Sequence, residues 1–341
     1  MRPCLLALVA LSLALPRAAV RADEPTQPTK PAPAAKPAPA APEGPPAPRP
    51  AITHPYLKSL AGTWDITAVL RGAEKKGSST IRIDLDGTAV INEMTGAEGY
   101  FGLGILYVGA DARSVSSWFF DTAGPGQVWA TTGELAEKGY VLHTEGGAMG
   151  PMKETMNAEE GGHVYEMWAG ENKVMSIHYR NHKDAEPRAA IARDKGPKSA
   201  LIDGLLGDWV VEGVTVIEAM KVEMRHTGTT TYRLALGGTL LAQDYEAKSA
   251  MEHNLGLGIT ALAADGKTLN HWLFWNTFDR PMVMKGTVEG ATFHAKADGG
   301  AMPGMEIVHK AIEGGHEFVV TFDIPGIGKG VSTETYKRAA R

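Results

Sequence analysis

The chain has 341 residues and a formal net charge of −5, with acidic and basic residues interspersed along its length. No basic stripe stands out, which argues against a nucleic acid partner. The only cysteine, Cys4, lies in the N-terminal apolar segment, so the rest of the chain has neither a disulfide nor a cysteine nucleophile.

Residues 1–22 have the pattern of a cleavable signal peptide. Arg2 supplies a positive charge, and the apolar run from Leu5 to Leu15 is too short to span a bilayer. Small or tolerated residues end this segment, with cleavage expected before Asp23. We therefore predict a periplasmic or secreted protein. No later stretch approaches the ~20 uninterrupted apolar residues of a membrane helix, so we expect no membrane span.

Residues 23–53 form a Pro/Ala-rich segment. Eleven of the 21 prolines lie between Pro25 and Pro50. Proline at this density removes backbone donors and favours extended polyproline II structure. We predict a disordered linker that acts as a tether. A ligand for a proline-binding module is the alternative interpretation.

The remaining chain carries an internal duplication. Seven collinear pairs match at an offset that drifts from 145 to 157 residues: Leu60–Trp64 with Leu205–Trp209, Asp86-Gly87-Thr88 with Gly237-Gly238-Thr239, Gly102–Ile105 with Gly256–Ile259, Ser117–Phe120 with His271–Phe274, Gly146–Met149 with Gly299–Met302, Glu160–His163 with Glu313–His316, and Tyr179-Arg180 with Tyr336-Lys337. Such order is typical of two copies of one domain. We predict a first domain over 54–183, a linker over 184–198 and a second domain over 199–341.

Each copy has the pattern of an antiparallel β-domain. Apolar residues alternate with polar ones from Ile81 to Leu85 and again from Tyr232 to Leu236, as in strands with one buried face. Glycine-containing turns follow both segments. One short helical turn is expected before each Gly-x-Trp, over 55–60 and 199–205. Short strands separated by glycine-rich turns indicate a sandwich or an up-and-down barrel.

The Leu-x-Gly-x-Trp start, the Gly-Leu-Gly-Ile segment, the Ser-Trp-Phe strand and the closing Tyr-Lys-Arg together resemble the DUF1579 family of uncharacterised proteins. The resemblance covers 205–338 and extends to the first copy. That family looks like a member of the calycin group, so the resemblance implies an all-β fold of two tandem antiparallel calycin-like barrels with eight strands each. It further implies that Trp64 lies near Arg180, and Trp209 near Arg338 or Lys337, where each pair closes a barrel end.

Four aromatic residues are the first candidates for ligand contact. Trp118 and Phe120 share one face of a strand in the first copy, and Trp272 and Phe274 do so in the second. An eight-stranded barrel is either filled by side chains or holds one small ligand. These residues therefore either line a cavity or pack as plain core.

Met149 and Met302 belong to paired Met-x-x-Met loops that end at Met152 and Met305. Thioether pairs suit Cu(I), but no histidine cluster accompanies these loops, so we interpret them as adaptable apolar cover over a barrel mouth and predict no metal site. His163 and His316 follow Gly-Gly turns. They either ligate haem, as the nitrobindin resemblance implies, or bond a turn carbonyl.

No catalytic motif is present: the sequence has no Gly-x-Ser-x-Gly elbow, no His-Glu-x-x-His and no phosphate-binding loop. We therefore expect a non-enzymatic exported protein, without a resident cofactor, that binds a small apolar or amphipathic ligand in its barrels. The alternatives are a nitrobindin-like haem protein acting on reactive nitrogen species and a packed-core module that contacts an unknown protein partner.

Overall fold

The computed structural model describes residues 51–70, 72–96, 99–122, 128–144, 150–182, 199–324 and 328–340. The predicted signal peptide, most of the predicted tether and the predicted linker at 184–198 lie outside these residues. Within them, no helix is both long and apolar enough to cross a bilayer.

The first half of the chain forms a closed antiparallel barrel in which each strand pairs with the next and the last pairs with the first. A short helix, α1 (Pro55–Ser59), precedes it. Its strands are β1 (Gly62–Leu70), β2 (Ala73–Asp84), β3 (Ala89–Gly96), β4 (Phe101–Val108), β5 (Ser114–Asp121), β6 (Trp129–Ala136), β7 (Gly139–Thr144), β8 (Met152–Glu159), β9 (Gly162–Ala169) and β10 (Asn172–Asn181).

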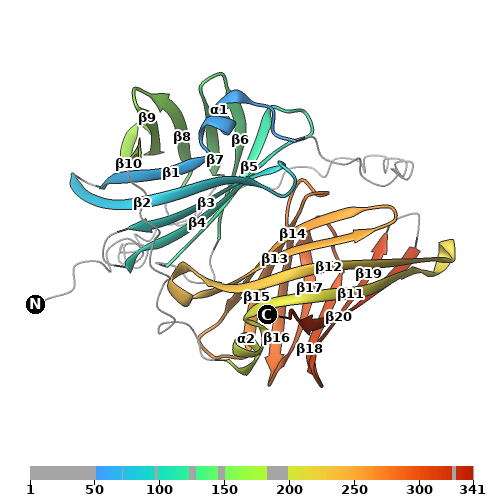
Figure 1. Ribbon diagram of the computed structural model, residues 1–341. Coiled ribbons are helices and arrows are strands. Elements are labelled where there is room, and N and C mark those ends of the chain that lie inside the picture. The colour runs from blue at the N-terminus through green and yellow to red at the C-terminus, as the bar shows by residue number, and fades with distance from the viewer. Residues whose placement is uncertain are drawn as a thin grey trace, which may run out of the picture.

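The second half repeats this arrangement after α2 (Ala200–Leu205) (Figure 1). Its strands are β11 (Gly207–Ile217), β12 (Val222–Ala235), β13 (Leu240–Ser249), β14 (His253–Leu262), β15 (Thr268–Trp275), β16 (Met282–Glu289), β17 (Thr292–Gly300), β18 (Glu306–Ile312), β19 (Gly315–Ile324) and β20 (Gly328–Arg338), with 3₁₀ turns η3 (Glu218–Met220) and η4 (Leu236–Gly238). The all-β tandem of barrels and both short helices are confirmed.

The strand number differs from the expected eight. Each described barrel closes with ten strands, and each strand pairs antiparallel with the next one along the chain. Barrel diameter grows with strand number, so ten strands enclose more interior than eight. The short helix at one end of each barrel contributes side chains that occupy part of this interior.

The two barrels meet through the outer faces of equivalent strands. Apolar side chains of β3, β4 and β5 pack against those of β13, β14 and β15 in one continuous buried cluster. The Tyr107 ring lies 5.8 Å from the Phe274 ring, and the Phe120 ring lies 5.0 Å from the Trp272 ring, both edge to face. Tyr107 also donates a hydrogen bond of 3.2 Å to the Trp275 carbonyl. This interface fixes the two barrels against each other.

The turn at Gly237 serves both the hairpin and the interface. Its φ of +64° is in the left-handed region that favours glycine. A Cβ added there would lie 2.7 Å from the ring of Phe101 in the other barrel. Glycine at this position therefore permits the turn and the close approach of the barrels together.

Candidate functional site

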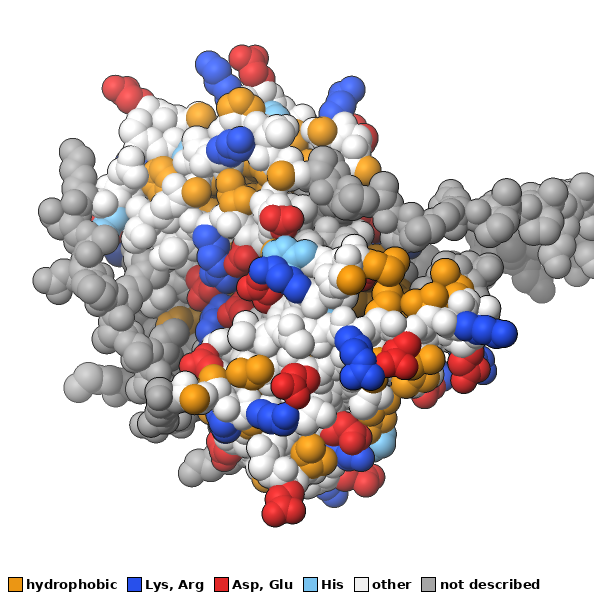
Figure 2. All heavy atoms as spheres, turned by 45° about the vertical axis from the view of Figure 1, so that its right-hand side comes forward, with side chains coloured by type: hydrophobic (Ala, Val, Ile, Leu, Met, Phe, Trp, Pro, Cys, Tyr) orange, Lys and Arg blue, Asp and Glu red, His pale blue; other side chains and the backbone are white. Residues whose placement is uncertain are grey.

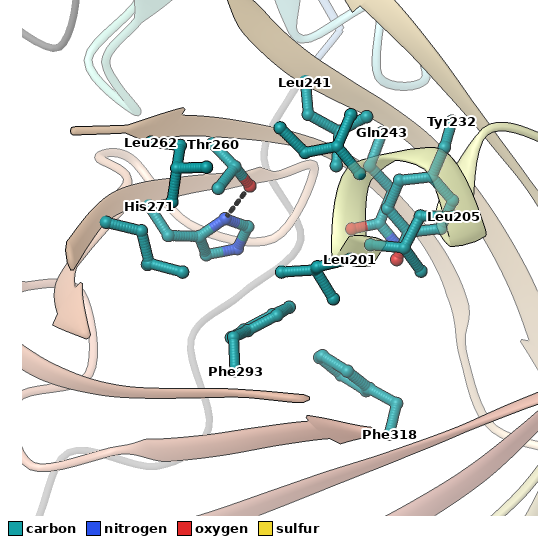
Figure 3. Close-up of a pocket in the computed structure, with 12 residues that line it drawn as sticks. Leu201, Leu205, Tyr232, Leu241, Gln243, Thr260, Leu262, His271, Phe293 and Phe318 are labelled. Atoms are coloured by element: carbon teal, nitrogen blue, oxygen red, sulfur yellow. Dashed lines mark hydrogen bonds between the residues drawn. The ribbon is translucent and has the colours of Figure 1, made fainter. Parts of the chain in front are cut away.

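The described structure contains a small cavity inside the second barrel, directly beneath α2 (Figure 3). Leucines of the helix form its roof, and side chains from six strands form its walls. Its volume is about 10 Å³, close to the minimum that holds one water molecule. The lining residues are Leu201, Ile202, Leu205, Tyr232, Leu241, Gln243, Thr260, Leu262, Leu269, His271, Phe293 and Phe318.

One wall of this cavity is polar. Thr260 Oγ1 and His271 Nδ1 lie 2.9 Å apart, at neighbouring positions on β14 and β15. Beside them, Gln243 Nε2 donates to Thr230 Oγ1 over 3.2 Å. The opposite wall is formed by Phe293 and Phe318. A site of this kind is amphipathic, with an apolar body and a few polar groups that orient what it holds.

His309 lies immediately behind the apolar wall. Its side chain is completely buried, and neither ring nitrogen has a hydrogen-bond partner among the described residues. Its ring centroid lies 5.3 Å from that of Phe293 and 5.4 Å from that of Phe318. Buried polar groups in native proteins almost always have a partner, either from the protein or from an ordered water molecule. His309 is therefore the side chain in this interior that most requires one.

Burial keeps the interior imidazoles uncharged. It lowers the pKa of His271 to about 4. Burial, assisted by repulsion from His316 and His271, lowers the pKa of His309 to about 3. Both rings are neutral near pH 7, so each offers one donor and one acceptor.

A buried carboxylate lies deeper in the same barrel. Glu334 accepts hydrogen bonds from the hydroxyls of Tyr245 over 2.8 Å and Tyr336 over 2.9 Å. It also lies 3.0 Å from His226 Nε2. The position of Glu334 corresponds to Ile177 of the first barrel, so this polar group belongs to the second copy alone.

The first barrel has diverged at several equivalent positions. Tyr56 stands where Leu201 stands in α2, four residues before the leucine that ends the helical turn. Met156 stands where His309 stands, since each is paired with the aromatic residue of the preceding strand. The first barrel has a buried acid of its own, Glu154. Burial raises the pKa of Glu154, which accepts a hydrogen bond from Trp129 Nε1 over 2.7 Å. The two interiors therefore differ in their buried polar side chains.

The four predicted aromatic contact residues lie between the barrels and not in either interior. Phe120, Trp272 and Phe274 are buried in the interface, and Trp118 packs against it 5.5 Å from Phe274. The sequence pattern correctly grouped each pair on one strand face. That face is the outer face of the barrel, and it is apolar because the other barrel covers it.

The two predicted histidines hold the helices. His316 Nε2 donates to the carbonyl of Gly204 in α2 over 3.2 Å, and its ring packs 4.8 Å from that of Trp209. His163 is bonded to the backbone of Ser59 at the end of α1 and lies 4.8 Å from the Trp64 ring. Each indole in turn donates to a leucine carbonyl at the end of its helix, Trp64 to Leu60 and Trp209 to Leu205. In both cases the bonded backbone group belongs to the short helix and not to the Gly-Gly turn that precedes the histidine.

Of the predicted closure pairs, one forms the expected stack. Arg338 Cζ lies 3.8 Å from the centre of the Trp209 ring, and the same guanidinium donates to the Gly204 and Leu206 carbonyls. Arg180 instead pairs with Glu159. The C-terminal end of α2 is thus tied by Trp209, His316 and Arg338, whereas its first turn is held by the buried Leu201 and Ile202.

Of the methionines, Met149 lies outside the described residues. Met302 is half-buried and packs against the core of the second barrel, and Met305 is buried in it. The described residues contain no group of three or more His, Cys, Asp or Glu side chains arranged to hold a metal ion.

A second hollow of about 600 Å³ lies where the barrels meet. Its walls carry a chain of ion pairs: Glu93 of β3 bonds Arg82 of its own barrel over 2.6 Å and Arg233 of the other over 3.0 Å, and Arg233 reaches Asp244 over 3.3 Å. Figure 2 shows charged side chains of both signs gathered on the band between the barrels. These pairs join the two halves at the rim of the apolar interface.

Comparison with known proteins gives little further information. No protein-family model matches the chain. No curated protein matches it by sequence. Among solved structures, the chain is similar to a protein of unknown function from the DUF3598 family of Nostoc punctiforme PCC 73102. That match has 10% sequence identity and a TM-score of 0.30, and it covers 85% of this chain and 100% of the other. Similarity at this level identifies neither a family nor a function.

Proposed function

We propose that the protein is an exported, non-enzymatic binding protein whose second barrel takes up a small, mainly apolar molecule beneath α2. The observation that carries the proposal is an amphipathic cavity whose apolar wall lies against His309, a fully buried imidazole to which no described residue is hydrogen-bonded at either nitrogen. The signal-peptide pattern supports export. Relationship to the DUF1579 family remains part of this proposal, on the motifs quoted above.

Uptake requires α2 to move, because the cavity below it has a volume of only about 10 Å³. The helix is six residues long and includes Gly204, a poor helix former. Its Ser199 cap makes no side-chain hydrogen bond. Among the described residues, the side chains that hydrogen-bond to α2 from the barrel all do so at its C-terminal end. The first turn therefore pivots about residues 204–206 and withdraws Leu201 and Ile202 from the barrel.

Replacing Leu201 with Tyr, the residue of the first barrel, is expected to weaken binding by at least ~10-fold, since the larger ring fills the cavity (10-fold is about 1.4 kcal/mol). The measurement is a fluorescence titration with the neutral apolar probe N-phenyl-1-naphthylamine. Asp203→Ser, an exposed change in the same helix, is the matched control and should bind as the wild type does. Thermal melts verify that both variants fold. Absence of saturable one-site binding to the wild type would contradict the proposal.

A further inference from the structure

No described residue places a permanent positive charge inside the second barrel. Among all described residues, the buried polar set contains no lysine and no arginine. In the second barrel it comprises hydroxyls, amides, histidines and one carboxylate, Glu334. Two described cations of this barrel are half-buried, and both lie on its outer face. Arg233 pairs with Glu93 and Asp244, and Lys310 pairs with Glu317.

The negative charge of Glu334 acts on the cavity wall. Tyr336 donates to Glu334, and Tyr232, which lines the cavity, is bonded to Tyr336. Burial and the nearby carboxylate raise the pKa of Tyr232 well above its usual range. In a low-dielectric interior, the Coulomb interaction between two charges is strong. An anionic group that enters the cavity would therefore be repelled by Glu334, and no described cation would pair with it.

A cationic group also finds no direct contact with a carboxylate in this cavity. Glu334 already bonds the hydroxyls of Tyr245 and Tyr336 and lies within bonding distance of His226. These three groups are bonded to its oxygens, so the field that opposes an anion attracts a cation only from a distance. An ammonium would lose its hydration without gaining a direct carboxylate contact.

The groups that do face an entering molecule are neutral. His271 and Thr260 lie on the cavity wall, and Gln243 lies beside them. A neutral imidazole, a hydroxyl and a carboxamide each both donate and accept hydrogen bonds. They match a head group with the same dual capacity.

We infer that the second barrel selects apolar molecules with an uncharged head group that both donates and accepts hydrogen bonds, such as an alcohol or a primary amide, over the carboxylate or ammonium of equal chain length. This inference rests on the proposed function, and it names the class of ligand for the same site.

The test is a displacement series against bound N-phenyl-1-naphthylamine at about pH 8, where carboxylate and ammonium are both ionised. The competitors are 1-decanol, decanoate and decylammonium, which differ in the head group alone. We expect 1-decanol to bind at least ~10-fold more tightly than either ion. Equal or tighter binding of decanoate would overturn the inference, and so would tighter binding of decylammonium. Failure of all three to displace a bound probe would also overturn it, whereas failure of the probe to bind would overturn the proposed function.

A variant isolates the contribution of Glu334. Glu334→Gln keeps the shape of the side chain and removes its charge. We expect it to lower the ratio of the dissociation constants of decanoate and 1-decanol by ~3-fold or more. Glu306→Gln, an exposed change on β18, is the control and should leave the ratio unchanged. An unchanged ratio in Glu334→Gln would overturn the electrostatic basis of the inference. The wild-type series decides the head-group preference even if this variant does not fold.

Discussion

Replacing Phe274 by Ala is expected to lower the free energy of unfolding by about 3–5 kcal/mol, the usual cost of deleting a buried phenylalanine ring. The ring is completely buried between the two barrels, where it contacts the rings of Tyr107 and Trp118 edge to face. Its loss leaves a cavity in a close-packed interface and removes aromatic contacts from both halves of the chain.

Chemical denaturation followed by circular dichroism measures this effect. We expect the variant also to separate the unfolding of the two barrels, since the interface couples them. Met251→Ala is the control, because Met251 is 73% exposed. A loss of less than about 1 kcal/mol in Phe274→Ala would contradict a close-packed interface.

The second large effect is on the pH dependence of stability. The wild type is expected to lose free energy of unfolding between pH 7 and pH 4. Replacing His309 by Met, the residue of the first barrel, should make this loss smaller by on the order of 3 kcal/mol. Burial lowers the pKa of His309 from 6.5 in the unfolded chain to about 3. Between these values the unfolded state binds a proton that the folded state does not, so stability falls as the pH drops below 6.5. Methionine has no such proton.

Urea denaturation at a series of pH values measures this difference. His294→Met is the matched control, because His294 is exposed on β17 and the exchange is the same. The His294 variant should follow the wild-type profile. A His309 variant that loses as much stability as the wild type would show that this imidazole is not held neutral by burial.

Much of the fold could be predicted from the sequence, for identifiable reasons. The duplication is visible because equivalent turns and tryptophans recur in one order. Two-residue alternation indicates strands directly, and the leucines before each Gly-x-Trp indicate a helical turn. The number of strands could not be read in this way, since the resemblance implied eight and the glycine-rich connections gave no sharper count.

The sequence could not distinguish the inside of a barrel from its outside. In β4, Leu103 and Ile105 face the second barrel, whereas Gly102 and Gly104 face the interior. A Cβ at Gly102 would lie 2.7 Å from the Phe119 ring, which explains glycine on that face. Both faces of such a strand are apolar or small. Their pattern therefore does not show which face meets a partner domain.

The candidate site was missed for a related reason. His309 and Glu334 belong to no motif, and their counterparts in the first copy are Met156 and Ile177. Each alternates in phase with a residue of the barrel interior, His309 with Ile307 and Glu334 with Tyr336. That phase was the available signal: a polar residue on a buried face marks a position that packing alone does not explain.

Native mass spectrometry of the protein, isolated without refolding, tests whether the second barrel holds a ligand. We expect one added small molecule per chain, lost on denaturation and absent from the Leu201→Tyr variant. An added mass retained equally by Leu201→Tyr would place the bound molecule elsewhere. A bare chain that also fails to gain mass with 1-decanol would contradict binding in the second barrel.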